Sequence, residues 1–199
     1  PLANPVLLAV CVIAPILWLT GTGYESYFEG AQFIHFLLGP ATVALAVPLR
    51  DNLGTIRRLA APILLALVAG SAVAVVSTIL LAQALGLPQP VILSLSPKST
   101  TAPVALGVSE AVGGIPTLTA VLVILTGVIG AVVVTPMMNL LGIRDWRARG
   151  FSVGVAAHGI GTARAFAVNE TAGAYAGVGM ALNALLTSLI VPVFVFWLV

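Results

Sequence analysis

The sequence predicts an all-α polytopic membrane protein with about five full spans and two polar re-entrant hairpins or broken helices in an inverted-repeat arrangement. Of its 199 residues, 60% are hydrophobic and only 7% are charged, and the mean hydropathy is +1.16. Long charge-free runs alternate with two polar interruptions, and the arginines gather in short segments between runs. This combination excludes an ordinary soluble domain.

Five apolar runs account for the predicted spans. They cover residues 5–20, 31–49, 61–85, 117–141 and 173–199. Crossing a bilayer takes about 20 helical residues, so the first run is short for a span. Gly39 and Pro40 interrupt the second run, because a proline removes a backbone donor and kinks or breaks a helix. Residues 21–30 are polar and acidic, and we expect them to form an outside loop.

The arginines orient the chain. They occupy two short segments, with Arg50, Arg57 and Arg58 in the first and Arg144, Arg147 and Arg149 in the second. Loops rich in arginine face the cytoplasm, and both can do so only if residues 87–114 enter and leave on one side. We therefore predict a re-entrant hairpin there. A second hairpin, residues 151–172, enters from the cytoplasm and turns near residues 158–164.

A rival geometry makes each polar segment an unwound helix that crosses the membrane, which places the second arginine segment outside. In the preferred geometry the chain is one transmembrane domain of four parts. Residues 1–60 hold two spans and a cytoplasmic loop, 61–116 and 117–172 each hold a span plus a hairpin, and 173–199 hold the last span. A span plus hairpin that occurs twice in opposite orientation is typical of transporters that bind substrate near the bilayer midplane.

The two polar interruptions carry the predicted site. Lys98 and Arg164 lie in them, and a charge at bilayer depth costs about 2.5 to 3.5 kcal/mol, so both cations need partners or water. An ammonium and a guanidinium suit a carboxylate. Pro103 favours the first helical position, so a helix should start just after Thr101 with its positive end at the hairpin tip. We predict that the two tips jointly bind a small anion.

The predicted substrate-binding residues are Lys98, Ser96, Ser99, Thr100, Thr101, His158, Gly161, Thr162, Arg164 and Asn183. Glu110 and His158 are candidates for proton coupling, since histidine titrates near neutral pH. Several alternatives stay open. Lys98 and Arg164 could instead extend to the lipid headgroups and pin the hairpins, and His158 could be a structural imidazole. Asn183, an amide inside the last span, either lines the pathway or bridges helices.

No enzyme is predicted. The sequence has no metal-ligand cluster, no nucleophile elbow and no phosphate-binding loop, so we expect no metal and no cofactor. The single Cys11 excludes an internal disulfide. The few basic residues orient the chain, and we expect no binding of nucleic acid.

Several motifs resemble one family. They are the runs at residues 30–33 and 38–49, Ser94-Leu95-Ser96-Pro97-Lys98-Ser99-Thr100-Thr101-Ala102-Pro103, Ser109-Glu110, residues 113–116, and Ala157-His158-Gly159-Ile160-Gly161-Thr162-Ala163-Arg164. Together they are similar to the LrgB/CidB family, over essentially the whole chain. Relatives often have Val-Thr-Thr-Pro where this chain has Thr100-Thr101-Ala102-Pro103. The resemblance transfers no binding residues.

The resemblance implies a multi-pass protein of the bacterial inner membrane, paired with a small holin-like LrgA/CidA protein and modulating murein hydrolase activity and autolysis. Family members begin with an additional hydrophobic segment, which we expect before Pro1. The plastid relative exchanges glycolate and glycerate, and bacterial relatives are linked to pyruvate movement. We therefore expect a secondary transporter of small monocarboxylates, and a homodimer. The alternative is a regulatory partner of the holin-like protein that transports nothing.

Overall fold

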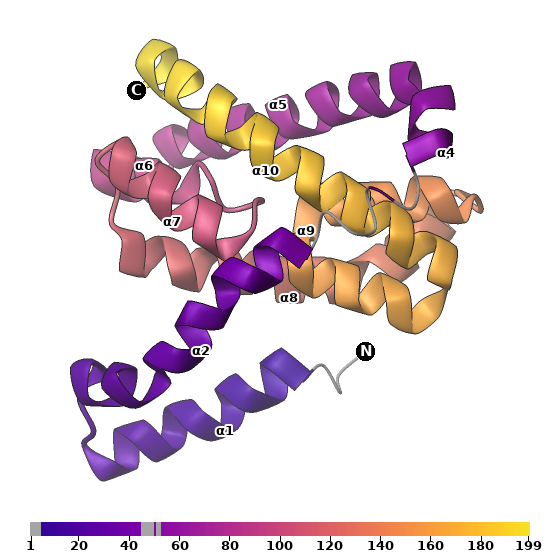
Figure 1. Ribbon diagram of the computed structural model, residues 1–199. Helices are drawn as coiled ribbons and strands as arrows, with labels where there is room; N and C mark the ends of the chain where they lie inside the picture. Colours follow the sequence, from indigo (N-terminus) through magenta and orange to yellow (C-terminus); the bar gives the residue numbers. More distant parts are fainter. Residues whose placement is uncertain (1–4, 45–49, 51–52) are drawn as a thin grey trace.

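The chain folds into helices that run almost from end to end (Figure 1). A computed structural model describes residues 5–44, 50 and 53–199, and all regular secondary structure in these ranges is α-helical. The helices are α1 (Pro5–Thr20), α2 (Tyr24–Ala44), α4 (Leu53–Arg58), α5 (Ala60–Ala84), α6 (Gln89–Leu95), α7 (Ala102–Ala111), α8 (Pro116–Leu140), α9 (Trp146–Val168) and α10 (Glu170–Leu198).

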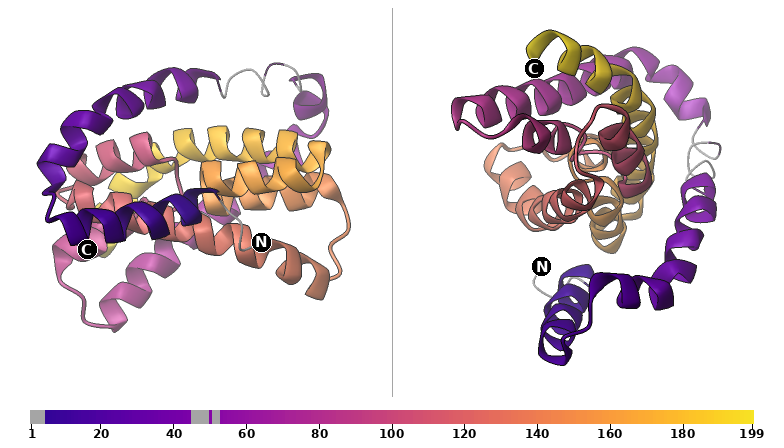
Figure 2. Two further views of the ribbon diagram at one scale, coloured as in Figure 1. Left: turned by 90° about the horizontal axis from the view of Figure 1, so that it is seen from below. Right: turned by 90° about the vertical axis from the view of Figure 1, so that its left-hand side faces the viewer.

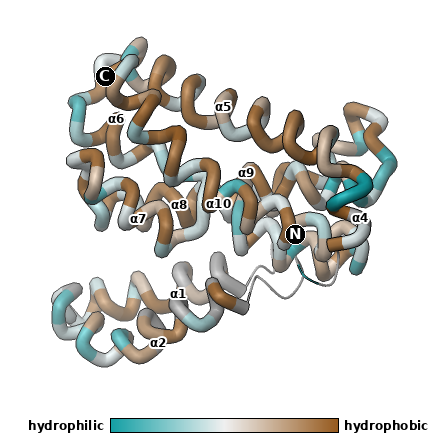
Figure 3. The backbone as a smooth tube through the Cα atoms, turned by 45° about the horizontal axis from the view of Figure 1, so that its top comes forward, coloured by the Kyte–Doolittle hydropathy of each residue, from teal (hydrophilic) through white to brown (hydrophobic). Residues whose placement is uncertain are grey.

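Three described helices, rather than five, are long and apolar enough to cross a membrane: α5, α8 and α10. Figure 3 shows hydrophobic residues along almost the whole of α5, with hydrophilic residues gathered at α4. Helix α1 matches the predicted run at both ends, but its 16 residues reach only about 24 Å, which is short of a 30 Å hydrocarbon core. The end of the second predicted span, residues 45–49, lies outside the described residues.

The loop expected at residues 21–30 is wrong over most of its length. Helix α2 already begins at Tyr24, so three residues connect it to α1. Gly21 has a φ of +65°, a conformation that suits glycine and ends a helix. Glu25 lies in the first turn of α2, where a carboxylate is favourable. Figures 1 and 3 show α1 and α2 set off to one side of the other helices.

The rest of the chain forms one interlocked bundle. Helix α9 packs most extensively against α10 and also against α8, while α10 crosses α5 and touches α7. Figure 2 shows α10 running along the bundle beside these helices. Buried apolar side chains join α5 to α9 and α10 at one end of the bundle, and α5 to α6, α7 and α10 at the other. The internal repeat and the four-part division of the chain stay predictions.

Helix α9 reverses direction in its middle. Ala157 (φ −131°, ψ 17°) and His158 (φ 41°, ψ −136°) are not helical. A Cβ on Gly161 would lie 3.0 Å from the Val153 carbonyl oxygen, although residues eight apart in a continuous helix are about 12 Å apart. The chain therefore turns back at His158, as the hairpin prediction requires. The helix resumes at once, so Gly161 and Arg164 lie on its second half and not in a tip loop, contrary to expectation.

Two glycines let the first half of α9 lie directly on α10. A Cβ on Gly150 would fall on the carbonyl oxygen of Ala172, and one on Gly154 would fall on that of Ala176. Both pairs are four residues apart, so they line up on one face of each helix. Small residues at this spacing are the usual means by which membrane helices approach closely. The first half of the hairpin is thus held against α10 by backbone contact.

Asp145 begins α9 and supplies a pH-dependent cap. Its carboxylate accepts a hydrogen bond from the Arg147 backbone N–H at 2.8 Å and pairs with the Arg147 guanidinium at 2.7 Å. These bonds lower the pKa of Asp145 from 3.8 to about 2. A lowered pKa means that the cap is fully present above pH 3.8 and is lost as the pH falls through the pKa of the folded protein.

We expect carboxyl NMR of the protein in detergent to titrate Asp145 with a midpoint near the pKa of about 2. In Arg147→Ala the midpoint should rise towards the ordinary value, because the hydrogen bonds from Arg147 are the main cause of the lowered pKa. Arg144→Ala, which removes an exposed neighbouring cation, is the matched control and should leave the midpoint in place. An ordinary midpoint in the unmodified protein would contradict this cap.

Candidate functional site

The tip of the α9 hairpin rests against the middle of α8. The His158 ring is buried, and its Nε2 atom lies 2.9 Å from the Val123 carbonyl oxygen. A Cβ on Gly127 would meet that ring at 2.7 Å, so the glycine makes room for it. The positive φ of His158 is a strained conformation for a residue with a side chain. The imidazole thus serves first as a structural anchor for the turn, one of the two roles predicted for it.

Helices α6 and α7 are too short to cross a membrane separately, at seven and ten residues. The Thr119 hydroxyl, near the start of α8, lies within hydrogen-bond distance of the Ser94 carbonyl oxygen of α6, at 3.0 Å, and of the Ser109 hydroxyl of α7, at 2.7 Å. Both helices are therefore tied to the same end of α8. Helix α7 starts at Ala102, directly after Thr101, with a proline in its first turn, as predicted from Pro103.

Asn183 joins the two polar segments. Its side-chain N–H₂ donates to the Ser99 carbonyl at 3.1 Å and to the Val155 carbonyl at 3.0 Å. Its oxygen accepts from Ser71 at 2.6 Å and from Thr187 at 3.2 Å. These four bonds use the full capacity of an amide. Asn183 is 1% exposed, and it bridges helices, which is the second of the two roles left open for it.

The junction lies at mid-depth in the bundle. Ser71 is near the middle of α5, and Asn183 is near the middle of α10. The α9 turn contacts α8 at Gly127, near the middle of that helix. The two polar segments approach this level from opposite ends of α8, since α6 and α7 are tied to its start and α9 follows its end. The two polar segments therefore meet near the middle of the bundle, and the position of this level at the bilayer midplane stays a prediction.

A cavity of about 310 Å³ opens beside this junction. Its lining residues come from α5, the α6–α7 loop and the first half of α9: Ala66, Gly70, Ala74, Lys98, Ser99, Phe151, Ser152, Val155 and Ala156. The volume is within the range of small-molecule sites. Lys98 is partly buried, and within the described residues its ammonium has neither an ion pair nor a hydrogen bond. The cavity thus offers an unpaired cation among mostly apolar walls.

Sequence reasoning missed the α5 side of this cavity and the Ser71 hydroxyl that holds Asn183. Residues 66, 70 and 74 are small and four apart, so they share one face of α5. Small residues are frequent throughout α5, so this spacing gave only a weak signal. Ser71 lies in an apolar run, where a single serine gives no hint of a partner on a helix 112 residues away.

The other predicted hydroxyls divide into two groups. Ser96 donates to the Leu93 carbonyl at 2.8 Å, and Thr162 to the His158 carbonyl at 2.8 Å, so both serve their own turns. Thr100 and Thr101 are 1% and 7% exposed, and their hydroxyls lack any partner in the described part of the chain. Glu110 is exposed near the end of α7, apart from the residues that line the Lys98 cavity.

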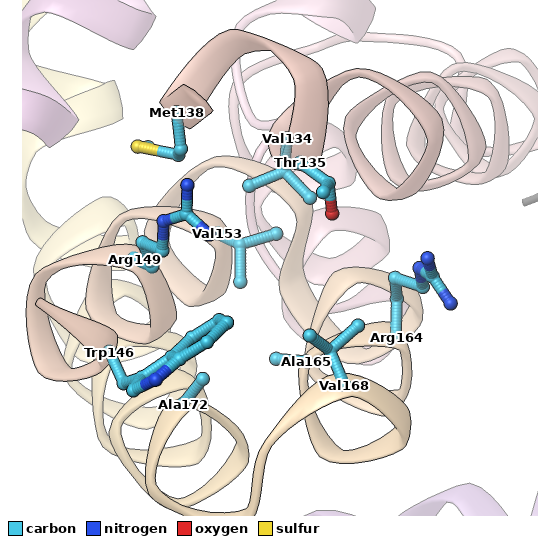
Figure 4. A pocket seen from close by; sticks show the side chains of 10 residues that line it. All are labelled: Val134, Thr135, Met138, Trp146, Arg149, Val153, Arg164, Ala165, Val168 and Ala172. Carbon is cyan, nitrogen blue, oxygen red and sulfur yellow. The ribbon is translucent and has the colours of Figure 1, made fainter. Parts of the chain in front are cut away.

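Arg164 lines a different cavity, of about 30 Å³, between α8, both halves of α9 and the start of α10. Figure 4 shows its guanidinium pointing away from Arg149 and Trp146, which border the same space. Lys98 is absent from that lining, and Arg164 is absent from the lining of the larger cavity. The expected joint grip by Lys98 and Arg164 is therefore not what the geometry offers. The helical restart after His158 carries Arg164 away from the tip.

Fold and site together define a multi-helix membrane protein in which broken helices meet at mid-depth beside a cation-bearing cavity. In the described residues, no group of three or more His, Cys, Asp and Glu side chains is placed to hold a metal. The chain belongs to the LrgB-like family, whose family model matches residues 1–197.

Relatives with similar sequences cover nearly the whole chain. The uncharacterized protein YwbG of Bacillus subtilis is 39% identical over 189 residues, which is 95% of this chain and 84% of YwbG. The holin-like protein CidB of Staphylococcus epidermidis is 32% identical over 195 residues, covering 98% of this chain and 85% of CidB. An uncharacterized protein of Haemophilus influenzae is 37% identical over 196 residues, covering 98% and 84%. No solved structure matches.

Proposed function

We propose that this protein is a secondary transporter of small monocarboxylates such as pyruvate, glycolate or glycerate in the bacterial inner membrane. The observation that carries the proposal is the mid-depth cavity around Lys98. A cation without an acidic partner is costly at such depth, and a bound carboxylate would repay that cost through a charge-assisted hydrogen bond. The apolar walls leave room for a short carbon chain.

The break in each polar segment supplies a means of movement. Both tips are held to α10 through the Asn183 amide, and the α9 turn is held to α8 through His158. Opening of the site to one side requires a tip to shift relative to these anchors. Transport follows when substrate binds the two arrangements with different affinity on the two sides of the membrane.

Uptake by purified protein in liposomes tests the proposal. We expect saturable uptake of a labelled monocarboxylate that unlabelled monocarboxylates compete away. Lys98→Ala should reduce uptake about tenfold to a hundredfold, because a hydrogen bond to a charged group is worth about 1.5 to 3 kcal/mol. Lys98→Arg should keep part of the activity. Arg144→Ala removes an exposed cation in the loop after α8 and is the matched control.

The name of the CidB relatives, holin-like protein, favours a second candidate, a holin-like role. In this proposal the protein acts with an LrgA/CidA-type partner in the control of murein hydrolases. That role needs assembly in the membrane, as a homodimer or with the partner, and no substrate. Non-selective leakage of a dye from the same liposomes, unsaturable and unaffected by Lys98→Ala, would support it and would overturn the transporter proposal.

A further inference from the structure

Gly70 stands out among the residues that line the Lys98 cavity. It lies near the middle of α5, one turn from Ala66 and from Ala74, and these three form the α5 wall of the cavity. Glycine in a helix interior is destabilising relative to alanine. A glycine in such a position therefore needs a reason.

Helix packing does not supply that reason. A Cβ on Gly70 would meet only the Val155 side chain, at 3.4 Å, which is close to ordinary van der Waals contact. By contrast, a Cβ on Gly154 or Gly150 would collide with the backbone of α10. Alanine fits at position 70 without moving a helix, so what the glycine preserves is space in the cavity.

A second observation, at Ser99, supports a ligand in this space. Ser99 lines the same cavity and is only 8% exposed. Its backbone carbonyl accepts a hydrogen bond from Asn183, while its hydroxyl forms no hydrogen bond within the described part of the chain and remains accessible from the cavity that Ser99 lines. A hydroxyl that is open to a cavity can donate a hydrogen bond to a ligand oxygen or accept one from a ligand. Lys98 and Ser99 thus place two unsatisfied polar groups on the loop side, and the small α5 residues form another wall.

The polar groups lie on the loop side of the cavity and the small apolar residues on the α5 side, and this arrangement sets the orientation of a bound acid. The carboxylate belongs at Lys98, with a neighbouring oxygen at the Ser99 hydroxyl, and the carbon chain extends over the apolar wall. We propose that Gly70 determines substrate specificity by setting the longest carbon chain that the cavity admits. This inference rests on the proposed function, and it adds the residue that selects among monocarboxylates.

Competition in the liposome assay tests the role proposed for Gly70. Labelled glycolate uptake would be competed with unlabelled straight-chain monocarboxylates of two to six carbons. For the longest acid that competes in the unmodified protein, we expect Gly70→Ala to weaken competition about tenfold relative to the two-carbon acid, the effect of one methylene in a fitted pocket. Gly70→Leu should extend this loss to shorter acids. Ala74→Gly should act in the opposite direction and admit a longer acid.

The control is Gly107→Ala, the same change within α7 at a position where a Cβ would meet nothing within 4 Å. It should leave the competition profile unchanged, and size-exclusion chromatography should show every variant folded. If Gly70→Leu transports with an unaltered chain-length profile, Gly70 does not select, although the transporter proposal stands. If the unmodified protein shows no competable uptake at all, both proposals fall.

Discussion

Gly154→Leu should yield no folded protein. A Cβ at position 154 would already fall on the carbonyl oxygen of Ala176, and its next neighbours would be backbone atoms 2.8 Å away. Backbone cannot rotate aside as a flexible side chain can, so the first half of α9 would have to separate from α10. Separation breaks the bond from Asn183 to the Val155 carbonyl, one residue further along the same helix.

Gly154→Ala should destabilise the protein in the same way, but less than Gly154→Leu. Overpacking a tight contact usually costs about 1 to 3 kcal/mol, and we expect the upper end here, measured by denaturant titration in mixed micelles. Gly159→Ala is the matched control, because it lies just past the turn and its Cβ would meet only the Met180 sulfur at 3.7 Å. Equal stability of the two alanine variants would show that α9 and α10 do not touch at Gly154.

The sequence predicted much of the fold because a membrane span is a long apolar run, which can be recognised from composition alone. The apolar runs at 61–85 and 117–141 differ from α5 and α8 by one residue at each end, and Pro103 correctly marked the start of α7. The turn near His158 was predicted from the arginine-rich loops that orient the chain and from the polar segment at residues 158–164. These features depend on hydropathy, the missing N–H of proline and the charge of short loops, and they need no knowledge of distant contacts.

The site was harder to predict because it depends on rotation about helix axes. Arg164 comes six residues after the turn at His158, and a helix that resumes immediately carries it into another cavity. Whether the chain resumes as helix or stays extended is decided by packing on α8 and α10. The proposed role of Gly70 was also hard to predict, because it depends on the residues that face Gly70 across the cavity. The loop expected at residues 21–30 failed since a helix can start within an acidic segment.

Asn183→Ala should destabilise the protein by about 2 kcal/mol or more. Interhelical hydrogen bonds in membrane proteins average about 0.6 kcal/mol and reach about 1.7, and this substitution removes four, including those to the Ser99 and Val155 carbonyls. It also leaves the buried Ser71 hydroxyl without its acceptor. Because the amide links α5, α10 and both polar segments, the loss is not confined to one helix pair.

Asn183→Asp tests whether the direction of these hydrogen bonds matters, because aspartate has almost the same size and shape as asparagine. Aspartate keeps the acceptor for Ser71 and Thr187, but it turns an oxygen towards two carbonyl oxygens that now receive N–H groups. We expect it to be at least as destabilising as alanine despite its matching shape, in the same denaturant titration. Ser188→Ala, which removes a bond within α10 alone, should be nearly neutral. Tolerance of aspartate at position 183 would mean that the amide does not hold the two tips.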